Sequence, residues 1–108
     1  VVGKRQMCIR DREHTGIKPK VIEEIRTFAR KYNIDKVILF GSRARGDYRR
    51  TSDIDLAVVG GDFARFALDV DEETSTLLEY DIVDMSREMQ DELRQSIMRE
   101  GKILYEKV

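Results

Sequence analysis

The stretch LFGSRARGDYRRTSDIDLAV, residues 39–58, decides the fold. An apolar run ends at Gly41-Ser42, ten residues intervene, and the pattern Asp53-Ile54-Asp55 follows inside a second apolar run. Glycines beside arginines indicate a phosphate site, but two common phosphate loops do not fit. The Walker A loop needs lysine where the chain has Asp47, and the dinucleotide fingerprint needs glycine where it has Arg43. A phosphate site here must therefore use another device.

The residues around this stretch predict a small α+β fold, with a mixed sheet packed against helices. The gap between the two apolar runs, residues 41–53, is short for a parallel crossover, so we expect these strands to be antiparallel neighbours. Periodicity and turn residues predict helices at 19–32, 62–79 with a break near 71–76, and 87–100 capped by Ser86, and a short helix through 44–45 with Ser42 as its N-cap. Strands are predicted at 37–40, 54–59, 80–85 and 103–105. The acidic residues 71–73 are predicted to be a solvated helix end, and the apolar stripe of the last helix is predicted to be core: Met89, Leu93, Ile97 and Met98.

Composition excludes several classes of protein. A length of 108 residues predicts one domain, and the net charge of −1 gives no basic field for nucleic acid. One cysteine, Cys8, and one histidine, His14, exclude an intrachain disulfide and a Cys/His zinc site, and argue against a Ser-His-Asp or Cys-His mechanism. No apolar run reaches the roughly 20 residues of a membrane span. These features favour a cytoplasmic protein.

The first residues carry no functional prediction. Residues 1–13 lack periodicity, and MCIRDR within them resembles translated sequencing-adapter sequence. We expect 1–13 to be a non-native or disordered lead-in and 14–108 to form a single domain.

The D-x-D pattern predicts a metal site. Alternate side chains of a strand share a face, so Asp53 and Asp55 point the same way. Two neighbouring carboxylates repel unless a cation or proton intervenes, and Mg²⁺ prefers such a pair plus substrate phosphates. The alternative is a turn cap at Asp53 and a solvated Asp55. An EF-hand is excluded, because Ala57 stands where another oxygen ligand belongs.

A third carboxylate could come from the strand at 80–85, which carries Asp81 and Asp84. Three residues apart, they point to opposite faces of a regular strand. The pattern alone does not choose between them, and at most one can join Asp53 and Asp55 unless the strand bulges.

These residues together resemble a known family. Gly41-Ser42, the ten-residue gap and Asp53-Ile54-Asp55, followed by YDIVD at 80–84 and GKILYE at 101–106, resemble the minimal nucleotidyltransferases. These belong to the DNA polymerase β-like nucleotidyltransferase superfamily, and the resemblance covers about residues 19–108. It implies the polymerase β-like fold and transfer of a nucleoside monophosphate from a nucleoside triphosphate to an acceptor hydroxyl, with release of pyrophosphate (EC 2.7.7 class).

The resemblance also implies roles for single residues. Asp53 and Asp55 would hold two Mg²⁺ ions, and Asp81 would bind one of them and help to deprotonate the acceptor. Ser42 would bond the β/γ-phosphates, Gly41 would let the chain approach them, and Arg43 is a candidate triphosphate contact. A salt bridge at the rim of the sheet is the alternative for Arg43. We expect Arg45 to pair with Asp47, and Arg49 and Arg50 to lie in a solvated loop or to face a nucleic-acid acceptor.

The acceptor remains open at this level. Minimal members of the family resemble the antitoxin half of a pair whose partner is a HEPN-type RNase toxin, and there AMP passes from ATP to a tyrosine hydroxyl of the toxin. That is the favoured interpretation, and it leaves both homo- and hetero-oligomers open. A catalytically idle antitoxin or nucleotide sensor is the second hypothesis. An aminoglycoside-type enzyme is the third, although 108 residues leave no room for its second lobe except across a dimer.

Overall fold

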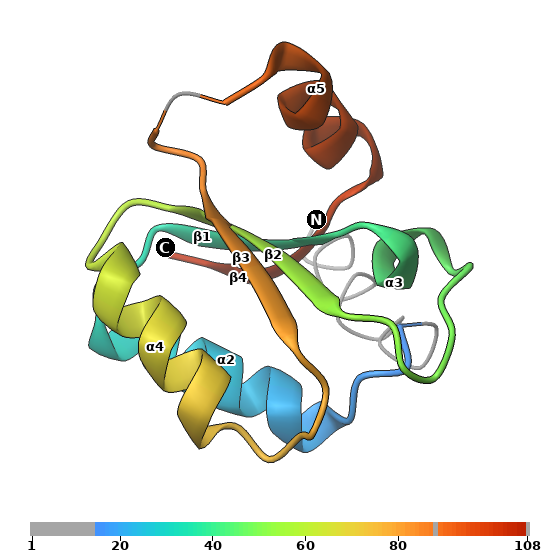
Figure 1. The fold of residues 1–108 in the computed structure, drawn as a ribbon. Helices are drawn as coiled ribbons and strands as arrows, with labels where there is room; N and C mark the ends of the chain where they lie inside the picture. Colours follow the sequence, from blue (N-terminus) through green and yellow to red (C-terminus); the bar gives the residue numbers. More distant parts are fainter. Residues whose placement is uncertain (1–14, 88, 108) are drawn as a thin grey trace, which may run out of the picture.

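The computed structural model describes residues 15–87 and 89–107, so the expectation for residues 1–13 lies outside them. Four strands form one sheet in the order β3-β2-β1-β4 (Figure 1). Strand β1 runs antiparallel to β2 and β4, whereas β2 and β3 are parallel, which confirms the predicted mixed sheet. The elements are α2 (Pro19–Lys31), β1 (Lys36–Phe40), α3 (Ser42–Arg45), β2 (Ile54–Val59), α4 (Phe63–Glu73), β3 (Tyr80–Asp84), α5 (Asp91–Glu100) and β4 (Lys102–Glu106).

The larger core lies between one face of the sheet and helices α2 and α4, which Figure 1 shows side by side below the strands. Pro19 opens α2 at a position where its missing N–H costs nothing, and Asn33, at φ 61°, turns the chain out of the helix. The core residues from the helices recur at helical spacing, and those from the strands alternate: Val21, Ile22, Ile25, Ala29, Phe66 and Val70 meet Val37, Leu39, Ile54, Leu56, Val58 and Leu104.

A smaller core lies on the opposite face, under α5 (Figure 1). Its buried members are Ile38, Ala57, Met85 and Ile97, with Met89 and Leu93 packed against them. The predicted apolar stripe of this helix is therefore largely confirmed. Met98 is the exception, because 66% of its surface is exposed.

Two helices begin at other residues than the sequence predicts. Helix α5 begins at Asp91 with Gln90 as its N-cap, instead of at residue 87. The hydroxyl of Ser86, its predicted cap, instead accepts a hydrogen bond from the N–H of Gly60 at 3.4 Å. In α3 the N-cap is Gly41, and Ser42 is the first helical residue. The predicted break after α4 is confirmed, since that helix ends at Glu73.

Among the described residues, no helix is both long and apolar enough to cross a membrane.

Candidate active site

The Gly41-Ser42 turn sits where β1 ends and α3 begins. Gly41 has φ 76° and ψ −157°, a backbone conformation that L side chains rarely adopt. A Cβ atom added there would lie 2.2 Å from Oδ2 of Asp55. Two separate constraints, backbone and space, therefore require glycine at position 41. The neighbour that demands the space is a carboxylate of the D-x-D pattern.

The strand registers bring the carboxylates to this turn. Antiparallel pairing sets Phe40 opposite Asp55, and parallel pairing sets Asp55 beside Asp81. Two residues further along, Ala57 and Val83 belong to the smaller core under α5. Since alternate residues share a face, Asp55 and Asp81 lie on the α5 face of the sheet. Asp53 directly precedes β2 and is exposed to solvent.

The structure also decides between Asp81 and Asp84. Asp84 shares its face with Ile82, which packs against the larger core, so it points away from Asp55. One carboxylate oxygen of Asp84 accepts a hydrogen bond from the N–H of Ser86 at 2.9 Å, and the other lies 3.9 Å from Nε of Arg87. Asp81 is the residue of the pair that lies beside Asp55.

The electrostatics of the site centre on Asp55. Burial raises the pKa of Asp55 to about 6, and the negative charges of Asp81 and Asp53 add to that shift. The positive charges of Arg45 and Arg43 oppose it without cancelling it. The nearby positive charges do not fully compensate the negative charges around Asp55, and a bound cation would stabilise its ionised form.

The donor set suits a hard ion. Within residues 15–87 and 89–107, no three His, Cys, Asp or Glu side chains are gathered closely enough to hold a metal by themselves. Mg²⁺ is usually bound by one or two carboxylates together with substrate phosphates. Asp53 and Asp55 supply that type of donor at the end of the sheet where the Gly41 turn lies.

Arg43 occupies a different place from the one predicted. Its side chain is buried, with 1% exposed, and its guanidinium group donates to backbone carbonyls of Thr15 (2.7 Å), Ser52 (3.1 Å), Arg50 (3.2 Å) and Arg49 (3.4 Å). Burial lowers its pKa. Since these bonds occupy the guanidinium, its position argues against the predicted contact with a triphosphate, and against a rim salt bridge as well.

What Arg43 does instead is organise the loop that leads into the D-x-D pattern. Its carbonyl partners at 49, 50 and 52 all lie in residues 46–53, between α3 and β2. Its guanidinium carbon also stands 4.8 Å from the ring centroid of Tyr48, a cation–π contact. The sequence offered no signal for this role beyond a basic residue after a glycine turn.

The other arginines follow the prediction more closely. Arg45 pairs with Asp47, as expected, and also with Glu100 of α5, each at 3.3 Å. Arg49 and Arg50 are exposed on the loop. The acidic residues 71–73 are exposed at the end of α4, as the solvated helix end that their sequence indicates.

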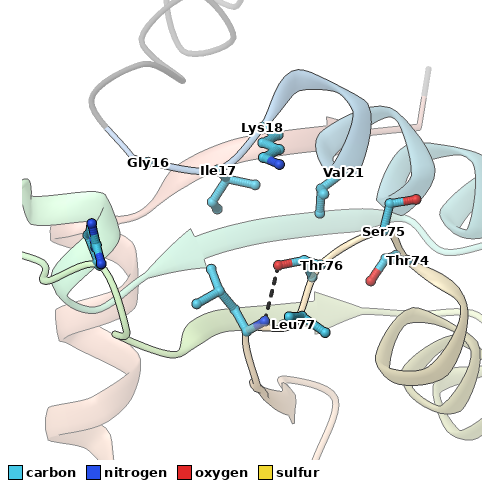
Figure 2. A pocket seen from close by; sticks show the side chains of 10 residues that line it. Gly16, Ile17, Lys18, Val21, Thr74, Ser75, Thr76 and Leu77 are labelled. Carbon is cyan, nitrogen blue, oxygen red and sulfur yellow. Dashed lines mark hydrogen bonds between the residues drawn. The ribbon is translucent and has the colours of Figure 1, made fainter.

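A cavity that the sequence did not indicate lies on the other side of the sheet, with a volume of about 540 Å³. Figure 2 shows the segment before α2, residues 16–18, and Val21 of its first turn facing the loop between α4 and β3. In that loop the N–H of Leu78 donates to the hydroxyl of Thr76 at 3.1 Å. Lys18 and Arg50 are its charged lining residues. None of Asp53, Asp55 and Asp81 lines it, so the cavity is separate from the carboxylates.

Comparison with known proteins agrees with this geometry. A model of the family described as "Polymerase beta, Nucleotidyltransferase" matches residues 23–108. The "Putative protein adenylyltransferase MJ0604" of Methanocaldococcus jannaschii is 37% identical over an alignment of 98 residues, which covers 80% of this chain and 96% of the relative.

Two solved structures are similar as well. One is a crystal structure described as a toxin-antitoxin with AMP-PNP, 26% identical, with a TM-score of 0.65 over 80% of this chain and 73% of the other. The second is a mutant of the toxin-antitoxin MntA-HpeT, 23% identical, with a TM-score of 0.63 and the same coverages. At that identity the second supports the fold alone. The α+β sheet is thus that of the polymerase β-like nucleotidyltransferases.

Proposed function

The chain belongs to the polymerase beta nucleotidyltransferase family, and we propose that it transfers AMP from ATP to a hydroxyl group of a partner protein. One observation carries the proposal: Asp55 and Asp81 stand side by side, next to a turn that only glycine can make. A relative described as a protein adenylyltransferase supports AMP as the group and protein as the acceptor. The similar toxin-antitoxin structure supports a toxin as the partner, with this chain as antitoxin. The family resemblance of the sequence is the ground for proposing that this toxin is of the HEPN type.

Asp53 and Asp55 are the proposed ligands of Mg²⁺, as two ions with Asp81 sharing one of them. When bound, such ions neutralise the phosphate charge and clamp the attacking and leaving oxygens of an in-line displacement. Ser42 is the first residue of α3, and its hydroxyl would bond the β- and γ-phosphates. Gly41 keeps the space beside Asp55 free of a side chain.

The proposed transfer balances as follows. The acceptor oxygen forms a bond to the α-phosphorus of ATP while the bond from that phosphorus to the bridging β-phosphate oxygen breaks, and pyrophosphate leaves. The acceptor hydroxyl gives up its proton, which the exposed carboxylate of Asp81 accepts. Asp84 faces the other way and takes no part.

The proposal is tested by label transfer. Purified protein is incubated with Mg²⁺, α-labelled ATP and the product of the gene adjacent to its own, and label should appear on that partner. Asp53→Asn combined with Asp55→Asn should lower the rate at least about a hundredfold, since the loss of one group that stabilises a transition state costs that much. Asp81→Asn should also lose activity.

Asp84→Asn is the matched control, because it removes a carboxylate from the same strand on the opposite face. It should lower the rate far less than Asp81→Asn, because Asp84 points away from Asp55. Full activity in the Asp53/Asp55 double variant would overturn the proposed site. An intact complex that never takes up label would instead favour the idle antitoxin.

A further inference from the structure

Strand β3 is an edge strand of the sheet, and some of its main-chain groups are available for hydrogen bonds. Among residues 15–87 and 89–107, it pairs with β2 on one side and with no strand on the other. The C=O of Glu79 and the N–H of Met85 both bond to β2. Alternate residues of a strand turn their main-chain groups to the same side, so those of Tyr80 and Ile82 point outward. Within the described residues no hydrogen bond occupies them.

The opposite edge, β4, is protected in the usual ways. Its pairing with β1 shifts register between Val37 and Ile38, and Lys102 and Lys107 carry positive charge along it. Bulges and lysines are devices that discourage further strand pairing. The pairing of β2 with β3 runs without a shift from Ile54↔Tyr80 to Val58↔Asp84, and β3 contains neither lysine nor proline.

An apolar groove of about 510 Å³ wraps around this free edge. Asp84 and Arg87 add charge to its lining. Main-chain pairing beside a side-chain pocket is the arrangement by which sheet edges recognise extended peptides. The apolar lining residues come from α4, β3 and the segment that ends in α5: Phe63, Ala64, Ile82, Val83, Met89 and Leu93.

The same strand carries Asp81, the proposed proton acceptor, two residues before Val83 and on the same face. We propose that the segment of the partner protein that bears the acceptor hydroxyl binds as an additional strand along the free edge of β3. Its hydroxyl residue lies beside Asp81, and an apolar side chain two residues away enters the groove beside Val83. This inference rests on the proposed function and adds how the acceptor is recognised.

The charges along the edge favour a foreign segment over a second copy. Glu79, Asp81 and Asp84 make the strand acidic, and Arg87 pairs with Asp84. Two copies would set this acidic strand against itself, and like charges across paired strands are destabilising. A neutral or basic segment meets no such repulsion.

The test uses a library of short synthetic peptides with a fixed central tyrosine and randomised flanking residues, incubated with the protein, Mg²⁺ and α-labelled ATP. Labelled peptides should be enriched in apolar residues two positions from the tyrosine and depleted of acidic ones. N-methylation walked along a selected peptide should abolish labelling at alternate positions, because main-chain groups on one side of the added strand make the bonds.

Two exposed apolar positions give matched variants. Ala64→Glu introduces a charge into the groove from α4, and it should lower labelling of the selected peptide by about tenfold or more, equivalent to about 1.4 kcal/mol. Met98→Glu makes the same kind of change on an α5 residue outside the groove lining and should change labelling less than about twofold. Fluorescence anisotropy should show that the Asp53→Asn/Asp55→Asn variant still binds the peptide.

Several results would overturn the inference. Labelling without a preference two residues from the tyrosine, or equal effects of Ala64→Glu and Met98→Glu, would contradict it while leaving the proposed transfer intact. A dimer in sedimentation that Ala64→Glu dissociates would assign the edge to a second copy instead. A protein that neither labels any peptide nor labels its partner would contradict the proposed function itself.

Discussion

At the scale of single residues, the position of Asp55 explains why residue 41 is a glycine. The carboxylate of Asp55 occupies the space that a side chain at position 41 would need. The sequence indicated both residues through the spacing of the glycine turn and the D-x-D pattern. Their contact joins β1 to β2, and only the folded chain shows it.

Gly41→Ala is expected to destabilise the protein and to abolish nucleotidyl transfer. An alanine there must adopt a positive φ, which costs about 1 kcal/mol or more of folding free energy, and its Cβ also displaces Asp55. Gly46→Ala is the matched control, because Gly46 has φ 96° but nothing within 4 Å of an added Cβ. Urea unfolding should show a loss about 2 kcal/mol larger for Gly41→Ala. Equal urea midpoints for the two variants would mean that the contact between position 41 and Asp55 does not affect stability.

Asp55→Asn is expected to change how stability depends on pH. The folded chain holds the Asp55 proton up to pH about 6, whereas in the unfolded chain it is lost near 3.8. The folded state therefore binds more protons between these values, and the unchanged, metal-free protein loses stability as pH rises through this window. The loss is on the order of 2 kcal/mol. Asparagine does not titrate, so the variant should lack that fall.

Thermal unfolding at pH 3.5 and pH 7, without divalent ions, measures the effect. The two proteins should differ more at pH 7, with the variant gaining. The same pH dependence in both proteins would show that folding does not raise the pKa of Asp55.

At the scale of elements, the loop from residue 46 to residue 53 depends on Arg43. One buried guanidinium bonds the carbonyls of Ser52, Arg49 and Arg50, so the loop reaches Asp53 in a set position. The carbonyl of Thr15 joins the chain before α2 to the same group. The family resemblance implied a triphosphate contact for Arg43, whereas in the folded chain its guanidinium bonds backbone carbonyls.

Arg43→Lys should loosen this loop. A lysine keeps the charge but lacks the planar fork that serves several carbonyls at once, so we expect a loss of about 2–4 kcal/mol. Arg45→Lys, at an exposed ion pair, should cost less than about 1 kcal/mol. Hydrogen exchange should show faster exchange at residues 46–53 in the first variant alone. Unchanged protection there would contradict the role of Arg43.

Most elements could be predicted from the sequence because their signals are local. Helical spacing in α2 and the apolar runs of β1 and β2 place these elements within a residue or two. The predicted start of α5 is wrong, since Ser86 has the residue type of a cap but its hydroxyl accepts from the N–H of Gly60, which follows the neighbouring strand β2. The residues that surround a polar side chain in the sequence do not show whether it will bond to a local or to a distant partner.

At the scale of the whole molecule, the sheet separates two cores of unequal size. The larger holds α2 and α4, and the smaller is completed by a single helix, α5. Few buried contacts hold α5, so it should open at lower free energy than the rest. Its segment also lines the proposed docking groove.

Ile97→Ala and Ile25→Ala test this division, because both side chains are buried and each belongs to one core. Each change should cost about 2–4 kcal/mol locally. In hydrogen exchange, Ile97→Ala should expose α5 while α2 stays protected, whereas Ile25→Ala should lower protection of both helices. Simultaneous loss of α2 protection in Ile97→Ala would show a single cooperative unit.

The sequence by itself determined the elements, the antiparallel pairing of β1 with β2, and the shared face of a D-x-D pattern, because each follows from the period of a helix or strand or from the length of one connection. Only the tertiary structure decided that Asp81, and not Asp84, stands beside Asp55, and that Arg43 is buried in a loop. Both depend on contacts between segments distant in the chain. The sequence pattern of a strand defines its two faces, but it does not show which face carries the carboxylates of the neighbouring strand. The pairing of β2 with β3 determines this.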